Sequence, residues 1–266
     1  MKDLVLSEIY IYPVKSLGGI KIYRADAGER GLKYDRRYLL VDDSGSFLTQ
    51  REYPQLALLK LSIEENGFKV LDTKNGDQIN IPFEFNSGDK MDVKIWSDVC
   101  NAIRLPEEIN LWFSRAISKN CTLVYMPDDE RRFVEKKYVA DEHIVSFADA
   151  YPYLIIGQSS LDDLNSRLDQ PVKMDRFRPN FVFRGGDPYE EDTWKDFEIN
   201  DVLFSAVKPC ARCVITTTDQ NTGARQKEPL KTLSTYRTIN NKVMFGMNVV
   251  SKNSGSVSVG SKIKLV

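Results

Sequence analysis

The sequence predicts a mainly β protein with a few helices, of the α+β class. Short apolar runs with period-two alternation dominate the chain, turn signals stand between them, and helical periodicity occurs in three places only. Runs of strands joined by hairpin signals favour antiparallel pairing over the strand–helix–strand order of a parallel sheet. We therefore expect mostly antiparallel connections.

The predicted strands are short apolar or alternating segments. They are Ile9–Tyr12, Tyr38–Val41, Leu58–Ile63, Phe68–Leu71, Thr122–Tyr125, Phe181–Phe183, Val202–Val207, Val214–Thr218 and Val257–Val259. Turns are predicted at Asp42–Gly45, Glu65–Gly67 and Asn75–Gly76, because each offers a residue that tolerates positive φ.

Three segments predict helices. The clearest is Pro106–Lys119, which has a proline in its first turn and an apolar face. That face consists of Ile109, Trp112, Phe113, Ala116 and Ile117. Ser160–Leu168 starts with a capping box of Ser160 and Asp163, and Pro229–Tyr236 predicts a short third helix.

A polar run divides the chain. Pro127–Arg132 follows the strand Thr122–Tyr125 and is typical of a boundary or a mobile loop. A chain of 266 residues, 42% of them hydrophobic, can form one large domain or two. We predict two domains, over residues 1–125 and 126–266.

Composition excludes several classes of protein. A formal net charge of −1 argues against binding a nucleic-acid polymer, although a local basic pocket could hold a small anion. A single histidine, His143, excludes a three-histidine metal site. The sequence has no secretory signal pattern and no apolar run of about 20 residues, so we expect a cytoplasmic protein that does not enter a membrane.

The segment that most strongly indicates chemistry is Lys208–Gly223. It contains a Cys-x-x-Cys pair, Cys210 and Cys213, with the cations Lys208 and Arg212 beside it. Neighbouring cations favour the thiolate form, which is the form that attacks substrates or binds metals.

Four interpretations of this pair are open from the residues alone: half a zinc site, a dithiol redox centre, one functional cysteine with a bystander, or two thiols in a β core. Cys100 and Cys121 form no second pair, which disfavours zinc. The predicted strand Val214–Thr218 leaves no helix to stabilise a thioredoxin-type thiolate. One functional cysteine, Cys213, is the favoured interpretation, and His143 is a less favoured partner for it as a general base.

Three basic clusters are either solvated surface or phosphate ligands: Lys15–Ser16, Arg36–Arg37 and Arg176–Asn180. Lys15 comes at a strand end, and the following proline is expected to hold Arg178 extended. Both side chains are then presented from restricted backbone and could reach a phosphate.

Six segments together make a specific combination: Ile11–Ser16, Asp35–Val41, Phe177–Asn180, Tyr189–Trp194, Cys210–Gly223 and Glu228–Leu233. This combination resembles the MOSC family, the module related to the carboxy-terminal domain of molybdenum cofactor sulfurase. The resemblance covers nearly the whole chain and is greatest to members that reduce amidoximes or detoxify N-hydroxylated bases. It implies a smaller MOSC N-terminal β-barrel domain over residues 1–125 and a MOSC β-barrel domain over residues 126–266.

The resemblance also implies a site for a molybdenum–pterin cofactor (Mo-molybdopterin). Cys213 matches the cysteine that ligates molybdenum, and a thiolate suits a soft metal. The positions implied to surround the pterin and its phosphate are Lys15, Ser16, Arg37, Asp149, Ala150, Tyr151, Arg178, Asn180, Ala211, Arg212 and Asn248. Ala211 and Asn248 differ from the animal members, which leaves the substrate preference open.

The implied activity is reduction of N–OH groups in amidoximes, hydroxylamines and N-hydroxylated bases. Its electrons would come from a separate ferredoxin, flavoprotein reductase or cytochrome b5, since the sequence has no iron–sulfur spacing and no dinucleotide fingerprint. Two alternatives are a sulfur-transfer module with a persulfide on Cys213 and a non-catalytic cofactor-binding protein.

Overall fold

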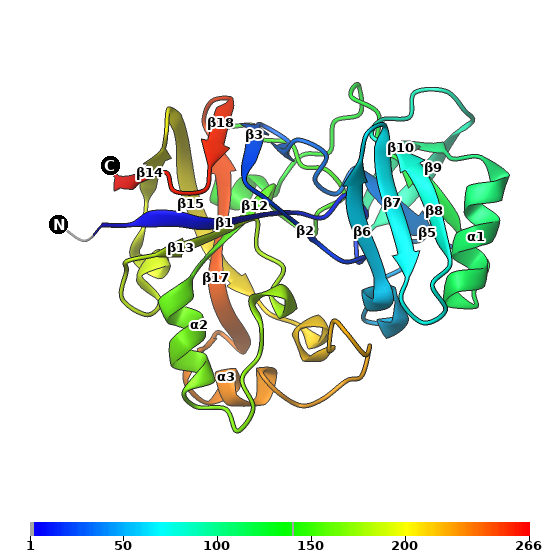
Figure 1. Cartoon of the computed structure of the whole chain (residues 1–266). Coiled ribbons are helices and arrows are strands. Elements are labelled where there is room, and N and C mark those ends of the chain that lie inside the picture. Colours follow the sequence, from blue (N-terminus) through cyan, green and yellow to red (C-terminus); the bar gives the residue numbers. More distant parts are fainter. Residues whose placement is uncertain (1–2, 140) are drawn as a thin grey trace.

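The computed structural model describes residues 3–139 and 141–266 and has the mainly β fold that the sequence predicts (Figure 1). The described residues form three α-helices and five short 3-10 helices. They are α1 (Glu107–Ile117), α2 (Gln158–Asn165), α3 (Leu230–Tyr236), η1 (Pro54–Leu58), η2 (Lys136–Tyr138), η3 (Met174–Arg176), η4 (Glu190–Thr193) and η5 (Val214–Thr217). All three predicted helices are confirmed, with small differences at their ends.

A nine-stranded sheet forms the larger half of the molecule. Its strands are β1 (Val5–Ile11), β2 (Ile20–Ile22), β12 (Tyr153–Gly157), β13 (Phe181–Arg184), β14 (Asp196–Ile199), β15 (Val202–Ala211), β16 (Thr238–Ile239), β17 (Lys242–Ser251) and β19 (Ile263–Leu265). Their spatial order is β19, β14, β15, β17, β12, β13, β1 and β2, with β16 paired to β17. Every pairing in this sheet is antiparallel except that of β12 with β13, as the hairpin signals predict.

Aromatic side chains form the centre of this half. Tyr153 stacks on Phe181 with ring centroids 5.5 Å apart, and Phe197 stacks on Phe204 at 5.4 Å. All four rings are buried. The Phe204 ring also meets Tyr153 and Phe181 edge-on, at 5.4 Å and 5.5 Å. Because aromatic pairs add about 0.5–1.5 kcal/mol beyond area burial, these contacts stabilise the arrangement of β12, β13, β14 and β15.

The smaller half contains two further sheets and α1. Its strands are β5 (Tyr38–Val41), β6 (Leu59–Glu64), β7 (Gly67–Asp72), β8 (Gln78–Pro82), β9 (Lys90–Ile95), β10 (Asp98–Arg104) and β11 (Thr122–Tyr125). One sheet runs β5, β11, β10, β9 and the other β6, β7, β8. The helix α1 packs on β11 and β8, and its predicted apolar face is buried.

The turn that follows β5 requires a glycine where the sequence predicts one. Gly45 adopts a φ of 76°. A Cβ atom at this position would lie 2.7 Å from the carbonyl oxygen of Asp92. The predicted turn Asp42–Gly45 is therefore confirmed, and only glycine meets both requirements without strain.

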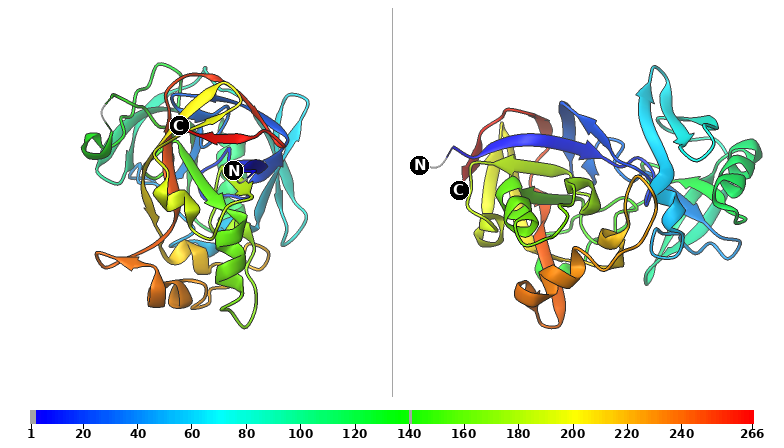
Figure 2. Two further views of the ribbon diagram at one scale, coloured as in Figure 1. Left: turned by 90° about the vertical axis from the view of Figure 1, so that its left-hand side faces the viewer. Right: turned by 60° about the horizontal axis from the view of Figure 1, so that its bottom comes forward.

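The first strands of the chain lie with its last ones. β3 (Arg24–Gly28) pairs with β18 (Gly255–Ser258) and with β4 (Gly31–Leu32), while β1 pairs with β13. Both views of Figure 2 show the blue amino-terminal strand among strands of the second half. Residues 5–32 precede the predicted border at residues 125 and 126, but their strands form backbone hydrogen bonds with strands that follow it.

The start of α2 differs from the predicted capping box. Ser160 lies inside the helix, and Gly157 precedes its first turn. The Ser160 hydroxyl donates to the Glu191 carboxylate at 3.0 Å, and the backbone N–H of Gly157 donates to the same carboxylate at 3.1 Å. The Ser160–Asp163 box is therefore wrong, because a buried carboxylate from η4 takes over the role of capping the helix.

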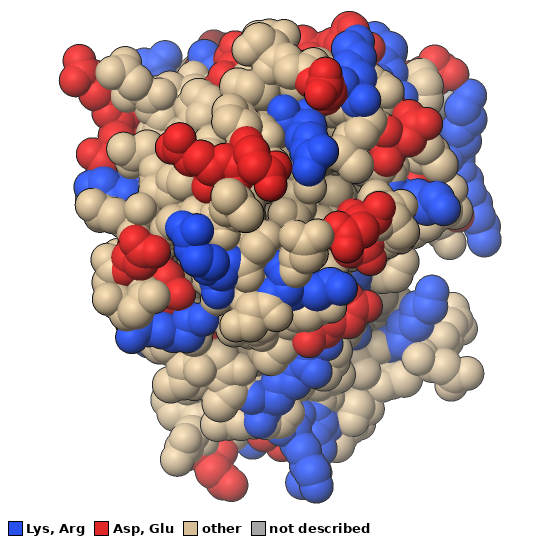
Figure 3. Space-filling model, turned by 90° about the vertical axis from the view of Figure 1, so that its right-hand side faces the viewer, with Lys and Arg blue, Asp and Glu red and all other residues tan. Residues whose placement is uncertain are grey.

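The surface carries charge of both signs. On the face shown in Figure 3, acidic and basic side chains are interspersed, in line with a net charge of −1. In the part of the chain that the structure describes, no helix is long and apolar enough to span a bilayer.

The buried carboxylate predicts a pH effect on stability. Burial raises the pKa of Glu191 from its usual 4.5 to about 7, against the lowering effect of its hydrogen bonds. Between pH 4.5 and pH 7, Glu191 therefore holds its proton in the folded chain and loses it on unfolding. The free energy of unfolding falls as pH rises through this range. Each pKa unit corresponds to about 1.4 kcal/mol of unfolding free energy. As pH rises from 4.5 to 7.5, the unfolding free energy of Glu191→Gln should therefore rise relative to that of wild type by up to about 3 kcal/mol.

Urea unfolding of both proteins at several pH values measures this difference, in which the other titrating groups cancel. A difference in unfolding free energy that stays constant from pH 4.5 to pH 7.5 contradicts the assignment.

Candidate functional site

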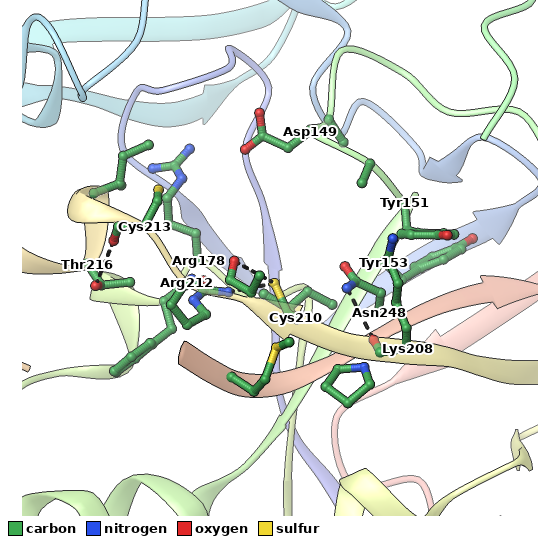
Figure 4. Close-up of a pocket in the computed structure, with 18 of the residues that line it drawn as sticks. Asp149, Tyr151, Tyr153, Arg178, Lys208, Cys210, Arg212, Cys213, Thr216 and Asn248 are labelled. Carbon is green, nitrogen blue, oxygen red and sulfur yellow. Dashed lines mark hydrogen bonds between the residues drawn. The ribbon is translucent and has the colours of Figure 1, made fainter. Parts of the chain in front are cut away.

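A cavity of about 560 Å³ lies beside β12, β15 and β17, within the size range of cofactor sites (Figure 4). Six cationic side chains and one carboxylate line it: Lys15, Arg36, Arg178, Lys208, Arg212, Lys242 and Asp149. In a chain of net charge −1, this is a strong local excess of positive charge. The cavity is suited to an anionic ligand.

Three residues of the cavity wall have left-handed backbone. Ser16, Arg36 and Arg178 adopt φ values of 69°, 51° and 56°, in the left-handed region that favours glycine. The extended conformation expected for Arg178 is therefore wrong. Strained residues of this kind persist where the surrounding structure holds them, and they are common at binding sites.

Two guanidinium groups of this wall share one aromatic ring. The Arg36 and Arg178 side chains lie 4.4 Å and 4.3 Å from the ring centroid of Tyr12. Arg36 donates to the Asp35 carboxylate at 2.6 Å, and Arg178 donates to the carbonyl of Leu17 at 2.6 Å. Burial lowers the pKa of Arg178 to about 10, so it keeps its charge at neutral pH.

Arg37, predicted to hold the cofactor, does not line the cavity. Its guanidinium donates to the Met126 carbonyl and, at 2.7 Å, to Asp128, and it lies over the Tyr125 ring. The neighbouring Arg36 faces the cavity instead. The sequence could not distinguish Arg36 from Arg37, because the directions of successive side chains in an irregular loop depend on the folded structure.

Lys15 and Asp149 form an ion pair in the cavity wall. The buried Lys15 ammonium donates to the Phe147 carbonyl at 2.6 Å and to Asp149 Oδ1 at 2.8 Å. Burial lowers the pKa of Lys15 to about 8, and Asp149 opposes that shift. Burial would raise the pKa of Asp149, but the Lys15 charge and hydrogen bond outweigh it and hold the pKa below its usual range.

Cys210 sits on an interrupted part of β15. The register of β15 against β17 shifts on both sides of Pro209, whose missing N–H breaks the ladder. The Arg212 guanidinium donates to Cys210 Sγ at 3.0 Å and to the Phe177 carbonyl at 2.6 Å. The cation expected beside Cys213 therefore contacts Cys210.

Cys213 is an exposed thiol that lines the same cavity. The predicted strand Val214–Thr218 is wrong, because η5 begins directly after Cys213. Thr216 closes this turn by donating its N–H and its hydroxyl to the Cys213 carbonyl at 3.2 Å and 3.0 Å. In Figure 4, Cys213 and Thr216 lie at one side of the cavity and Cys210 lies further along it.

The other predicted site residues have different surroundings. Ser16, Ala150, Ala211 and Asn248 line the cavity, and Asn248 donates to the Lys208 carbonyl at 3.2 Å. Asn180 also lines the cavity, although it is almost fully buried, and its side chain bonds Arg36 and the backbone of neighbouring strands.

Two donors in the lining are buried without a partner among the described residues: the Tyr151 hydroxyl and Arg212 Nε. Buried polar groups are nearly always hydrogen-bonded, so these two donors can be satisfied by a polar ligand. Burial also raises the pKa of Tyr151 to about 12, which keeps its proton available for donation.

Sequence reasoning missed Arg36, Tyr138 and Lys242 as lining residues. Arg36 stood in a basic cluster, but no signal marked Tyr138, whose ring lies 4.0 Å from the Lys208 ammonium. His143 does not line the cavity, so the general-base pairing with Cys213 has no support. Across residues 3–139 and 141–266, no three His, Cys, Asp or Glu side chains form a metal-binding group, so protein residues alone would not complete a zinc site.

Comparison with known proteins matches residues 4–120 to the MOSC N-terminal beta barrel domain and residues 142–264 to the MOSC domain. Mitochondrial amidoxime reducing component 2 of Rattus norvegicus is 31% identical, over 97% of this chain and 82% of that protein. Mitochondrial amidoxime-reducing component 1 of Mus musculus is 30% identical, over 98% and 82%. Molybdenum cofactor sulfurase of Oryza sativa subsp. japonica is 31% identical, over 93% of this chain but 32% of that protein.

The thiol environments predict an order of reactivity. Cys213 is exposed, whereas Cys100 and Cys121 are buried and burial raises the pKa of each to about 11. In ligand-free native protein at pH 8, iodoacetamide should modify Cys213 first and leave Cys100 and Cys121 intact until the chain unfolds. Peptide mass mapping measures this order, and labelling of Cys100 or Cys121 at the rate of Cys213 contradicts it.

Proposed function

Because this chain belongs to the MOSC family, we propose that it holds a molybdenum–pterin cofactor in the basic cavity and reduces N-hydroxylated compounds there. The observation that carries the proposal is an exposed thiol, Cys213, in a cavity with six cationic side chains and a single carboxylate. A soft-metal ligand and a receptor for a phosphate-bearing group thus share one cavity. The two amidoxime-reducing relatives align with nearly the whole chain, which supports the same reaction class.

The residues present fit such a cofactor. The unpartnered Tyr151 hydroxyl and Arg212 Nε are donors that a polar ligand would satisfy. Arg36 and Arg178 offer planar, permanently charged groups suited to a phosphate, and Lys15 adds a charge. Cys213 would supply the protein ligand to the metal.

The bound molybdenum–pterin group would supply two-electron redox chemistry at a metal that can accept an oxygen atom. Reduction of an N–OH group to N–H consumes two electrons and two protons and releases water. We propose that a separate redox protein delivers the electrons.

The chain's own residues would orient the reaction and supply charge. Lys15 Nζ, whose pKa is about 8, carries a proton at neutral pH and holds it between Phe147 and Asp149. A group with a pKa close to the working pH can donate and recover a proton readily. The cations of the wall also keep the cavity suited to negative charge throughout the reaction.

The alternative of sulfur transfer through a Cys213 persulfide is supported by the match to molybdenum cofactor sulfurase. That match spans only 32% of the sulfurase, so it carries less of the argument than the amidoxime-reducing relatives.

The proposal predicts a difference between the two cysteines of the pair. Protein purified from a host that makes the cofactor should contain about one molybdenum and one pterin per chain, by mass spectrometry and fluorescence. With a chemical reductant, Cys213→Ala should reduce benzamidoxime at least about 100-fold more slowly than wild type, because it lacks the metal's thiolate. Cys210→Ala is the matched control. Its rate should stay within about threefold of wild type, because the Cys210 thiol contacts Arg212 and is not the proposed metal ligand.

Wild-type protein without metal and pterin, or equal loss of activity in both variants, contradicts the proposal. Sulfane sulfur on Cys213 in metal-free wild type would favour the sulfur-transfer alternative.

A further inference from the structure

Trp96 occupies an unusual position beside the cavity. It begins the two-residue turn between β9 and β10, in which Ile95 pairs with Asp98, and its φ is 56°. Glycine and asparagine are the residues favoured at such positions, and a bulky residue there is strained by about 1–3 kcal/mol. A strained tryptophan at a turn indicates that the side chain itself has a role.

The Trp96 ring lies in a cluster of aromatic and cationic groups. It is 55% exposed, while the Arg51 guanidinium lies 4.5 Å from its centroid and the Phe47 ring meets it edge-on at 5.2 Å. Phe47 in turn lies 5.5 Å from the Lys15 ammonium in the cavity wall. The smaller half of the molecule thus places an exposed aromatic surface next to the cavity of the larger half.

Asp149 connects Trp96 to the cavity. Its Oδ1 accepts from Lys15 Nζ at 2.8 Å and from Trp96 Nε1 at 3.3 Å. Within the described part of the chain, no hydrogen bond reaches Oδ2, and the side chain is 56% exposed. The free oxygen belongs to a carboxylate that lines the cavity and stays ionised, so it can accept a hydrogen bond from a ligand.

We propose that Trp96 and Asp149 form the substrate-recognition edge of the cavity. The substrate class is a flat, neutral N-hydroxylated compound that carries an aromatic ring and an N–H group beside its N–OH group. Its ring contacts the Trp96 indole, and its N–H donates to Asp149 Oδ2. The Arg51 guanidinium, 4.5 Å from the Trp96 ring centroid, disfavours a positively charged ring at this edge, which leaves the neutral form. This inference rests on the proposed reductase function.

Substrate competition tests the proposal. The ratio of kcat/KM for benzamidoxime to kcat/KM for hydroxylamine does not depend on how much cofactor each variant carries. We expect Trp96→Ala and Asp149→Asn to lower this ratio about tenfold, since hydroxylamine has no ring and a stacking contact is worth about 0.5–1.5 kcal/mol. Val99→Ala, an exposed change on the same hairpin, is the matched control and should keep the wild-type ratio.

Intrinsic fluorescence gives a readout that needs no turnover. The other two tryptophans, Trp112 and Trp194, are 4% and 6% exposed. Benzamidoxime should quench wild-type emission saturably, and Trp96→Phe should abolish that quenching.

Equal quenching in Trp96→Phe, or an unchanged substrate ratio in both Trp96→Ala and Asp149→Asn, overturns the recognition edge. Failure of wild type to reduce either substrate refutes the reductase function instead. In that case saturable quenching that depends on Trp96 still supports the edge as a binding site, and its absence overturns the edge as well.

Discussion

The site depends on a buried ion pair between adjacent residues. Asp35 is 1% exposed, accepts the backbone N–H of Tyr12 at 2.8 Å and pairs with Arg36 at 2.6 Å. Arg36 also donates to the Asn180 amide and to the carbonyl of Arg178, both at 3.2 Å. Removing one partner of such a pair costs about 3–5 kcal/mol, because the other charge stays buried. This pair joins the start of the chain to the segment that presents Arg178.

The same contacts explain why the two halves of the chain act together. Residues 5–32 pair with strands of the larger half, so Lys15 and Ser16 reach a cavity whose remaining wall comes from β12, β15 and β17. The smaller half contributes Trp96, whose indole N–H donates to the Asp149 side chain. Arg132 donates to the Asp149 carbonyl at 3.3 Å and pairs with Asp98 of β10. The cavity is therefore a product of the whole fold.

The sequence predicted the periodic parts of the fold well, because alternation and helical spacing report directly which side chains are buried. It failed where long-range contacts decide. Val214–Thr218 has the β-branched composition of a strand, but the Cys213 carbonyl binds Thr216 and closes a 3-10 turn. Ser160 was predicted to cap its helix, but its hydroxyl donates to Glu191, which is 31 residues away in the sequence. Most of the positions that the family resemblance implied line the cavity, whereas the choice of Arg36 over Arg37 needed the geometry.

The central claim is that the cations of the cavity wall, and not basic residues in general, hold an anionic cofactor. Arg36 and Arg37 test it most directly, since they are adjacent residues of one type, each paired with an aspartate, and of the two Arg36 alone lines the cavity. Molybdenum retained after gel filtration would be measured for Arg36→Gln and Arg37→Gln, using samples whose thermal unfolding shows a folded chain. The account predicts that Arg36→Gln loses most of its metal and Arg37→Gln keeps the wild-type amount. Equal retention in the two variants, or loss confined to Arg37→Gln, would contradict it.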